Sequence, residues 1–96
     1  MNMDKFHWGN TINCKRNVKD PDTGEYFDPA TSMKITINNK VNGIEVDNQD
    51  MIKDTTGQYH YKYTPPANAP LGVYKVTYTA TDGADIGVFI DSFQLV

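Results

Sequence analysis

The chain has 96 residues, of which 39% are hydrophobic and 22% are charged, and its formal net charge is −3. This length fits a single domain, and the six tyrosines and four phenylalanines are typical of a globular chain rather than a disordered one. The nine basic residues are spread widely, whereas a nucleic-acid binder needs clustered positive charge to displace counterions from phosphates. The composition therefore predicts one globular domain over residues 1–96 and excludes nucleic acid as a partner.

The beginning of the chain, MNMDKFHWGN, contains no apolar segment of the kind that a signal peptide requires. No apolar run approaches the roughly 18–20 residues needed to cross a bilayer, so we expect no membrane insertion. The single cysteine, Cys14, excludes an intramolecular disulfide and is compatible with a reducing compartment. For a complete gene product, these features favour assembly in the cytoplasm.

Apolar and polar residues alternate along most of the chain, and this period of two is typical of half-buried β-strands. In the first alternating segment, Ile12, Cys14 and Val18 share one face, which Arg16 interrupts. Comparable segments follow at 33–37, 44–46, 59–63, 74–80 and 88–95. Residues that favour turns separate these segments. The pattern predicts an all-β fold, an antiparallel sandwich of about seven strands in two sheets.

The last alternating segment changes phase within its length. Val88 and Ile90 share one face, whereas Phe93 and Leu95 continue in the opposite phase. A slip of one residue would bring all four onto one face, because a β-bulge inserts a residue that has no partner on the neighbouring strand. We therefore expect a β-bulge at residues 91–92.

Four tyrosines are candidates for structural roles. Tyr59, Tyr61 and Tyr63 alternate strictly, so we expect their rings to fill the core with the hydroxyls at its rim. The alternatives are a platform for stacking on sugars and a protein interface. Tyr74 begins an alternating strand after a long polar loop, the place at which some β-sandwiches have a tyrosine whose hydroxyl bonds back to the backbone. The simpler alternative for Tyr74 is another half-buried strand residue.

The segment 20–28 carries alternating acidic residues around Gly24, an arrangement that superficially resembles a calcium loop. The third carboxylate of such a loop is missing, and Thr31 stands where a bidentate glutamate is expected. Asp-Pro and Thr-Gly also form ordinary hairpin turns. We therefore interpret the segment as a turn and keep calcium as the alternative.

His7, Cys14 and His60 are the candidates for binding zinc, but no two of them have the spacing of a zinc motif. Cys14 lies in the middle of a strand among apolar neighbours, a setting that raises the pKa of a thiol and leaves it unreactive. The glycines are isolated at turns rather than gathered in a phosphate-binding loop. We therefore predict no bound metal, no cofactor and no catalytic residue, and hence no enzyme.

Three residues are candidates for a contact surface: Phe6, Trp8 and Arg16. Phe6 and Trp8 precede the first regular strand. A tryptophan at this place either caps the open end of the core or docks onto a neighbouring subunit, and the cap is our interpretation. Arg16 occupies an otherwise apolar phase, as expected at an edge strand or a contact surface.

A series of short motifs extends over nearly the whole chain: Gly9-Asn10-Thr11-Ile12, Val18-Lys19-Asp20, Gly24, Asp28-Pro29, Ile35-Thr36-Ile37, Gly57-Gln58-Tyr59, Gly72-Val73-Tyr74 and Phe93-x-Leu95-Val96. Together they resemble the motifs of immunoglobulin-like (Ig-like) domains in bacteriophage and prokaryotic surface proteins. The chain departs from that pattern at Asn10, where aspartate is usual, and at Arg16, where the residue is normally apolar. These motifs are folding features, so the resemblance implies a fold rather than a ligand.

The resemblance implies a structural or adhesive role. We expect a non-enzymatic assembly module, either a phage virion component or a prokaryotic cell-surface domain, that binds other protein subunits by edge-strand pairing or loop docking. The absence of a signal peptide and the single cysteine favour the virion version. The alternative is a carbohydrate-binding or adhesive module for surface glycans, with or without calcium.

Overall fold

The computed structural model describes residues 4–20 and 22–96, and residues 1–3 and Pro21 lie outside the described part. The described residues form eight β-strands and no helix, so the all-β prediction is confirmed, with eight strands where about seven were expected. In particular, no helix among them is long and apolar enough to span a membrane. The strands are β1 (Asp4–Phe6), β2 (Ile12–Asn17), β3 (Ser32–Asn39), β4 (Gly43–Asp50), β5 (Ile52–Thr55), β6 (Gln58–Tyr63), β7 (Gly72–Asp82) and β8 (Asp85–Leu95).

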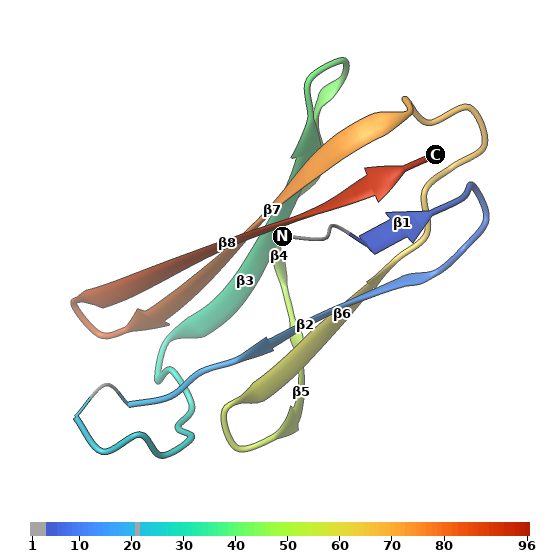
Figure 1. The fold of residues 1–96 in the computed structure, drawn as a ribbon. Helices are drawn as coiled ribbons and strands as arrows, with labels where there is room; N and C mark the ends of the chain where they lie inside the picture. Colours follow the sequence, from blue (N-terminus) through green and yellow to red (C-terminus); the bar gives the residue numbers. More distant parts are fainter. Residues whose placement is uncertain (1–3, 21) are drawn as a thin grey trace.

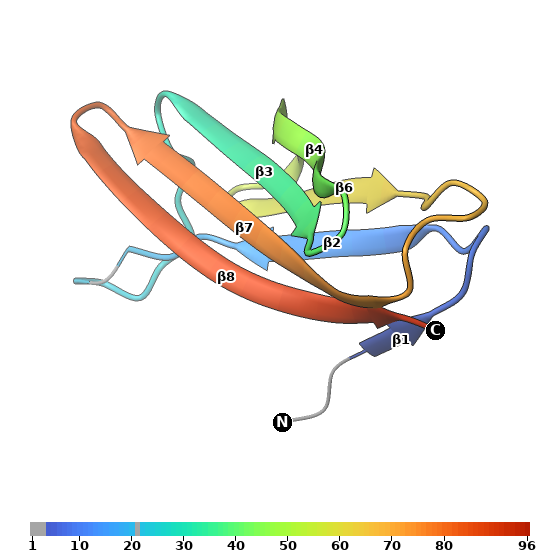
Figure 2. The ribbon, with the colours of Figure 1, turned by 90° about the horizontal axis from the view of Figure 1, so that it is seen from above.

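The strands form two sheets with the core between them (Figure 1). The larger sheet has the order β1-β8-β7-β3-β4, and the smaller has the order β2-β6-β5. Neighbouring strands are antiparallel except for β1, which runs parallel to the C-terminal end of β8 (Figure 2). The chain passes from the larger to the smaller sheet at Met51, whose side chain is buried and whose N–H donates to the Met33 carbonyl at 2.9 Å.

The core is built from the alternating side chains of both sheets. In β3 and in the 74–80 segment of β7, every second side chain is buried, as the sequence pattern predicts. The ring of Tyr74 stacks on that of Phe93, with their centroids 5.0 Å apart. Burying a large apolar side chain of this kind stabilises the folded state by roughly 1.5–3 kcal/mol. The buried hydrophobic residues are Ile12, Cys14, Val18, Met33, Ile35, Ile37, Val46, Met51, Tyr59, Tyr63, Ala69, Tyr74, Val76, Tyr78, Ala80, Phe93 and Leu95.

The β-bulge expected at residues 91–92 is wrong. β7 and β8 pair without any shift of register from Gly72 opposite Leu95 to Asp82 opposite Asp85. Along this regular strand Phe93 and Leu95 are buried, whereas Val88 and Ile90 lie on the opposite face and are exposed. The expectation failed because it assigned every apolar residue of the segment to the core, while β8 carries apolar side chains on both of its faces.

The strand with two register shifts is β4 instead, and β5 also shifts once against β6, between Lys53 and Thr55. The pairing of β4 with β3 shifts twice, so that Ile37 lies opposite Val46 and Ile35 lies opposite Gln49. Asn48 adopts a positive φ of 50°, and its N–H donates to the Thr36 hydroxyl at 3.1 Å. Such bulges bend a strand and interrupt its row of backbone hydrogen-bonding groups. The outer edge of β4 is therefore a poor template for a further strand.

Candidate docking edge

Most of β8 has a neighbouring strand on one side only. β7 pairs with β8 over its whole length, whereas β1 pairs only with residues Phe93–Leu95 (Figure 2). Among the described residues, 85–92 therefore form an open edge, and this name is kept below. An open edge presents unpaired backbone N–H and C=O groups that can bond to the strand of another chain.

The turn between β7 and β8 determines which residues direct these groups outward. Gly83 and Ala84 form a two-residue turn, with Gly83 at a φ of 62°, and a turn of this kind is closed by a hydrogen-bonded pair, Asp82 and Asp85. Hydrogen-bonded and non-bonded pairs alternate along an antiparallel ladder. The even-numbered residues of β8 consequently direct their N–H and C=O away from β7. Val96, which follows β8, fits this alternation, since its N–H donates to the carbonyl of Phe6, the last residue of β1, at 2.9 Å.

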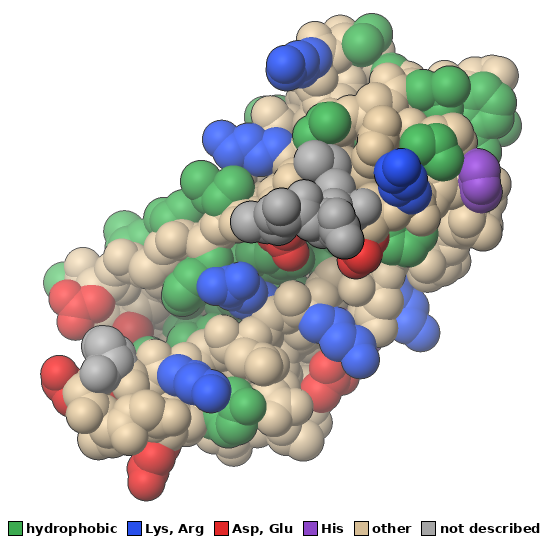
Figure 3. All heavy atoms as spheres, in the orientation of Figure 1, with side chains coloured by type: hydrophobic (Ala, Val, Ile, Leu, Met, Phe, Trp, Pro, Cys, Tyr) green, Lys and Arg blue, Asp and Glu red, His purple; other side chains and the backbone are tan. Residues whose placement is uncertain are grey.

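Three of the even-numbered side chains of the open edge, Ile86, Val88 and Ile90, form an apolar row on the outer face of the sheet. Ile86, Val88 and Ile90 are 66%, 56% and 62% exposed. In the neighbouring strand β7, threonines stand opposite all three of them. Figure 3 shows hydrophobic side chains gathered along this half of β8. Single exposed apolar residues are ordinary, but an aligned apolar row on an unpaired strand is typical of a contact surface.

The inner side of the open edge borders a seam between the two sheets. On the smaller sheet, the seam is formed by residues 14–17 of β2 and by residue 18, which follows it. On the larger sheet, it is formed by residues 87–91 of β8. β2 is itself an edge strand, and among the described residues β1 pairs with β8 only beyond this seam, at residues 93–95 (Figure 1). Two grooves lie along it. One includes Val18, Ala80 and Phe89 in its lining, and the other includes Cys14, Tyr78 and Asp91.

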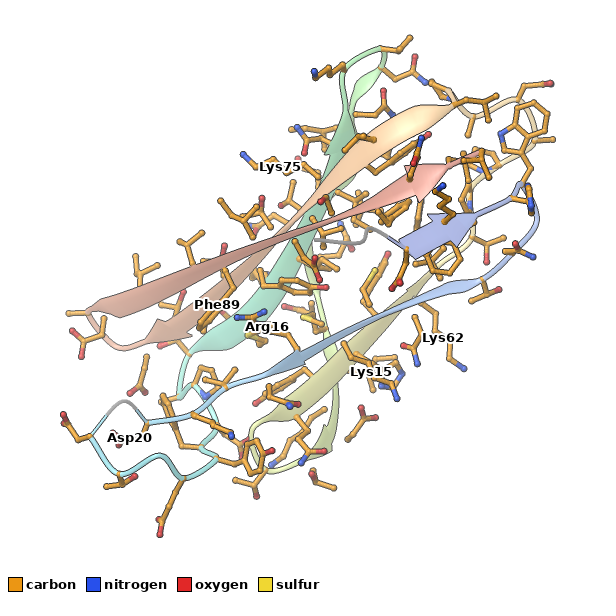
Figure 4. The ribbon with its side chains drawn as sticks, viewed as in Figure 1. Lys15, Arg16, Asp20, Lys62, Lys75 and Phe89 are labelled. Carbon is orange, nitrogen blue, oxygen red and sulfur yellow. The ribbon has the colours of Figure 1, made fainter. Side chains whose placement is uncertain are left out.

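Arg16 closes the middle of the seam. Its guanidinium lies 4.3 Å from the centroid of Phe89 and 5.9 Å from that of Tyr78 (Figure 4). The Nε atom is buried and has no hydrogen-bond partner among the described residues. A guanidinium stacked on aromatic rings gains roughly 0.5–2 kcal/mol and also covers the rings with its planar face. Arg16 is therefore the one cation among the alternating apolar residues of β2, and it covers the core at a place that would otherwise be open to solvent.

The structure does not bring Phe6 and Trp8 together with Arg16. Phe6 lies at the far end of the seam, where its ring packs edge-on against Phe93 at 5.9 Å. Trp8 is 45% exposed, and its indole N–H donates to the Ala69 carbonyl at 2.8 Å, which ties the start of the chain to the loop before β7. The apolar row of the open edge was missed by sequence reasoning, although its signal, the phase change in 88–95, was visible.

The tyrosines are directed toward the core and its rim. The Tyr74 hydroxyl donates to the Pro70 carbonyl at 2.7 Å, which is the bond expected of a corner tyrosine. Tyr59 is buried, and its hydroxyl donates to Asp28 at 3.0 Å. Burial, followed by the bond to Asp28, raises the pKa of Tyr59 to about 12. Tyr61 is half-buried against the core. None of these rings forms an open stacking platform.

The segment 20–28 forms a turn that is fixed to the smaller sheet. The Asp20 carboxylate accepts the N–H of Asp22 at 2.8 Å, which is a local turn bond. The Asp28 carboxylate accepts hydrogen bonds from Lys53 Nζ, the Gly57 N–H and the Tyr59 hydroxyl. The bond to Lys53, followed by that to Gly57, lowers the pKa of Asp28. The carboxylates at the two ends of the segment are thus used in different local networks.

The zinc candidates have different surroundings: Cys14 is buried, whereas His60, on the neighbouring strand, and His7 each have a partner at the surface. His60 contacts Asp54 at 2.6 Å, and His7 contacts the Val96 carbonyl at 3.0 Å. The described residues contain no group of three or more His, Cys, Asp or Glu that could hold a metal ion. Burial, followed by the charge of Asp91, raises the pKa of the Cys14 thiol to about 11, so the thiol stays protonated at neutral pH.

The open edge, with its outward backbone groups and apolar row, is the feature of the described residues that is best suited to contact another molecule. Comparisons with known proteins add no site to it. No protein-family model matches this chain, and neither a curated protein nor a solved structure matches it.

Proposed function

We propose that this chain is an Ig-like sandwich that acts as a non-enzymatic assembly module and binds another polypeptide as an added strand along the open edge. The observation that carries this proposal is the open edge itself, in which the exposed residues Ile86, Val88 and Ile90 also carry the outward backbone groups that have no strand partner among the described residues. In strand addition, the backbone bonds supply affinity and the alternate side chains supply specificity.

The order of the strands supports the Ig-like identity. In an Ig sandwich, strands B, E and D form one sheet and strands G, F and C form the other, with C′ added beside C in variable-type domains. The orders β2-β6-β5 and β8-β7-β3-β4 correspond to these two sets. The hydrogen bond from Tyr74 to Pro70 corresponds to the tyrosine corner at the start of strand F.

A comparison of the sheet edges supports β8 as the docking strand. Natural proteins discourage edge pairing with short strands, bulges and charged side chains. β1 and β5 are short, with three and four residues, and each carries both a lysine and an aspartate. β4 is bulged, and β2 carries Lys15 and Arg16. By contrast, the run from Ile86 to Ile90 pairs with β7 without a bulge and is uncharged.

The chemistry of Cys14 supports a role without catalysis. A catalytic thiol needs a lowered pKa, whereas burial raises that of Cys14 to about 11. Assembly with other protein subunits fits the virion or cell-surface setting that the sequence resemblance implies. Binding to surface glycans receives less support, because Tyr59 and Tyr63 are buried rather than displayed.

The proposal is tested by adding a strand-forming peptide to the isotope-labelled protein. The peptide has eight residues of alternating valine and threonine, followed by two lysines. Such a peptide can pair through its backbone with any unpaired strand edge. We expect NMR amide shifts centred on Ile86, Val88 and Ile90. The control peptide carries an N-methyl group on every residue and should cause no shift, since no N–H group remains to pair along either of its edges. Shifts centred on β4, or equal shifts with both peptides, would overturn the proposal.

A matched pair of protein variants sharpens this test. Val88→Lys places a charge on the open edge, and Ile44→Lys places the same charge on β4, where Ile44 is similarly exposed at 57%. We expect Val88→Lys to weaken peptide binding about tenfold or more, because the lysine disrupts the apolar row that contacts the added strand. Ile44→Lys should leave binding unchanged.

A further inference from the structure

We infer that the strand that fits the open edge is β8 of a second copy of this chain, so that two molecules join their larger sheets across a two-fold axis at Val88. This inference rests on the proposed function, since it uses the same edge. An isologous two-fold contact requires a surface that is complementary to itself. The open edge meets this requirement in its side chains, its backbone groups and its length.

The side chains are symmetric about Val88. If two β8 strands pair antiparallel around that residue, Val88 lies opposite Val88 of the second copy, and Ile86 lies opposite Ile90. Residues directly opposite in an antiparallel pair lie on the same face of the sheet, where apolar β-branched pairs stabilise the pairing. The exposed apolar row of each copy would thus be continued by that of the other.

The backbone groups have the matching alternation. Ile86, Val88 and Ile90 direct their N–H and C=O outward, as the turn at Gly83 and Ala84 requires. In the register centred on Val88 these residues oppose one another, so each pair exchanges two hydrogen bonds. A slip of one residue, which moves the axis to a point between Val88 and Phe89, would place outward groups opposite inward ones and would break this pattern.

The inner face also accommodates the second copy. Gly87 lies opposite Phe89 of the second copy in this register, in the closely spaced, non-bonded type of pair. Within one copy the Phe89 ring already lies over Gly87, since a Cβ on this glycine would be 3.7 Å from the ring. The Phe89 ring of the same copy thus covers this edge glycine, and Gly87 has no side chain of its own that projects toward the second copy.

The length of the open edge matches the symmetric pairing. In the register centred on Val88, Asp85 lies opposite Asp91, and pairing ends at the turn on one side. On the other side it ends before Phe93, the first residue of β8 that pairs with β1. The paired segment therefore fits between the turn and β1 without displacing either.

The two aspartates set the strength of the contact. Asp85 and Asp91 of opposite copies meet at both ends of the paired segment, and like charges directly opposite destabilise strand pairing. An edge contact alone also buries less area than a stable dimer interface of about 1,600 Å². We therefore expect a weak, concentration-dependent dimer, strengthened by Asp91→Asn.

Disulfide trapping tests the position of the axis. In a Cys14→Ala background, Val88→Cys places two thiols on the axis, with the Cα separation near 5.5 Å that a disulfide accepts. Ile86→Cys, at a similarly exposed position, places its two thiols roughly 13 Å apart. We expect oxidation to cross-link the Val88→Cys protein at least tenfold faster. Equal rates for the two proteins would overturn the inference.

Sedimentation equilibrium up to about 1 mM protein gives an independent readout. We expect Val88→Lys to raise the Kd of the dimer tenfold or more and Ile44→Lys to leave it unchanged. Asp91→Asn removes the like-charge repulsion with Asp85 at both ends of the paired segment. We therefore expect it to lower the Kd about 2- to 30-fold. Asp47→Asn, on β4, is the matched control and should have no effect. A protein that remains monomeric throughout would overturn the inference.

The two proposals fail in different ways. If the valine–threonine peptide binds at Ile86, Val88 and Ile90 while the protein stays monomeric, the edge accepts a strand of another protein and only the second-copy inference is wrong. If the peptide does not bind and the protein is monomeric, both are wrong. If Ile44→Lys rather than Val88→Lys abolishes the dimer, the copies associate through β4, which overturns the inference in its stated form.

Discussion

The guanidinium of Arg16 lies 4.3 Å from the centre of the Phe89 ring, so that a side chain of β2 meets one of β8 across the seam. Tyr78 contributes a second ring at 5.9 Å. The contact explains how β2 tolerates a cation in its apolar phase, because a guanidinium is weakly hydrated and stacks on aromatic rings. It also joins the two sheets at the seam, where no further strand of the described residues pairs with β2 or with residues 87–91 of β8.

Replacing Arg16 by alanine should therefore destabilise the fold. The variant loses the stacking on Phe89 and exposes the two rings, and we expect the free energy of unfolding to fall by about 1–2 kcal/mol. Urea denaturation measures this change. Lys15→Ala is the control, since Lys15 is the exposed neighbour on the opposite face of β2 and should cost less than about 0.5 kcal/mol. An equal effect of the two substitutions would show that the stacking contributes nothing.

Tyr74→Phe removes only the hydroxyl that bonds to Pro70 at 2.7 Å. Because the ring is buried and stays in place, the loss is that of one hydrogen bond, and we expect a decrease of about 1 kcal/mol in unfolding free energy. Thermal unfolding should show a melting temperature lower by about 4–8 °C. Tyr61→Phe serves as the control, because Tyr61 is only half-buried. A melting temperature unchanged by Tyr74→Phe would contradict the corner role.

Gly57→Ala should be one of the most damaging single substitutions in the chain. Gly57 has a φ of 72°, and a Cβ there would lie 2.7 Å from the Val18 carbonyl oxygen and 2.9 Å from the Phe27 nitrogen. Backbone strain costs about 1–2 kcal/mol, and the clash with backbone atoms adds to it, so we expect a loss above about 2 kcal/mol.

Gly24→Ala separates the two contributions to this loss. Gly24 has a similar φ of 75°, but no atom of the other described residues, its two chain neighbours aside, lies within 4 Å of its would-be Cβ. Denaturant unfolding of both variants should therefore show the larger loss for Gly57→Ala, with the difference reporting the clash. Equal losses would mean that the loop around Val18 and Phe27 moves aside freely.

Asp28 predicts a pH dependence of stability. Its pKa is lowered in the folded protein, first by the bond to Lys53 and then by that to Gly57. The unfolded chain therefore binds a proton more readily, and the stabilisation is present above the unfolded pKa of about 3.9 and is lost as the pH falls through the lower, folded pKa. Urea midpoints measured from pH 6 to pH 2 should show this decline.

Asp28→Asn is expected to remove this part of the acid dependence while lowering stability at pH 6. Asp22→Asn provides the control, because the Asp22 carboxylate has no part in the Lys53 and Gly57 network. If Asp28→Asn and the unmodified protein lost stability in parallel below pH 4, the bonds to Asp28 would not be the source of the effect.

Much of the core follows from the sequence, because alternation reports directly on which side chains share a face of a strand. The segments 33–37 and 74–80 alternate in the structure as they do in the sequence. The same rule failed for Val88 and Ile90, since alternation does not say whether the second face of a strand is covered. That depends on which strands are neighbours, and this is decided by contacts between distant parts of the chain.

The open edge shows the same limit of prediction from the sequence. Arg16 was expected at an edge strand or a contact surface, and β2 is an edge strand of the smaller sheet. The sequence does not predict, however, that β1 pairs with β8 only at residues 93–95, so that residues 85–92 form the open edge among the described residues. Only the assembled sheet reveals which backbone groups remain unpaired.

The parallel pairing of β1 with the end of β8 determines how the domain would bear mechanical tension. Asp4 lies opposite Phe93, and Phe6 lies opposite Leu95, close to the two ends of the described chain. A force that pulls on both ends drags these parallel strands past each other along their length. Their hydrogen bonds are then loaded together in shear rather than opened one after another, so the small β1 strand resists extension more strongly than its three residues suggest.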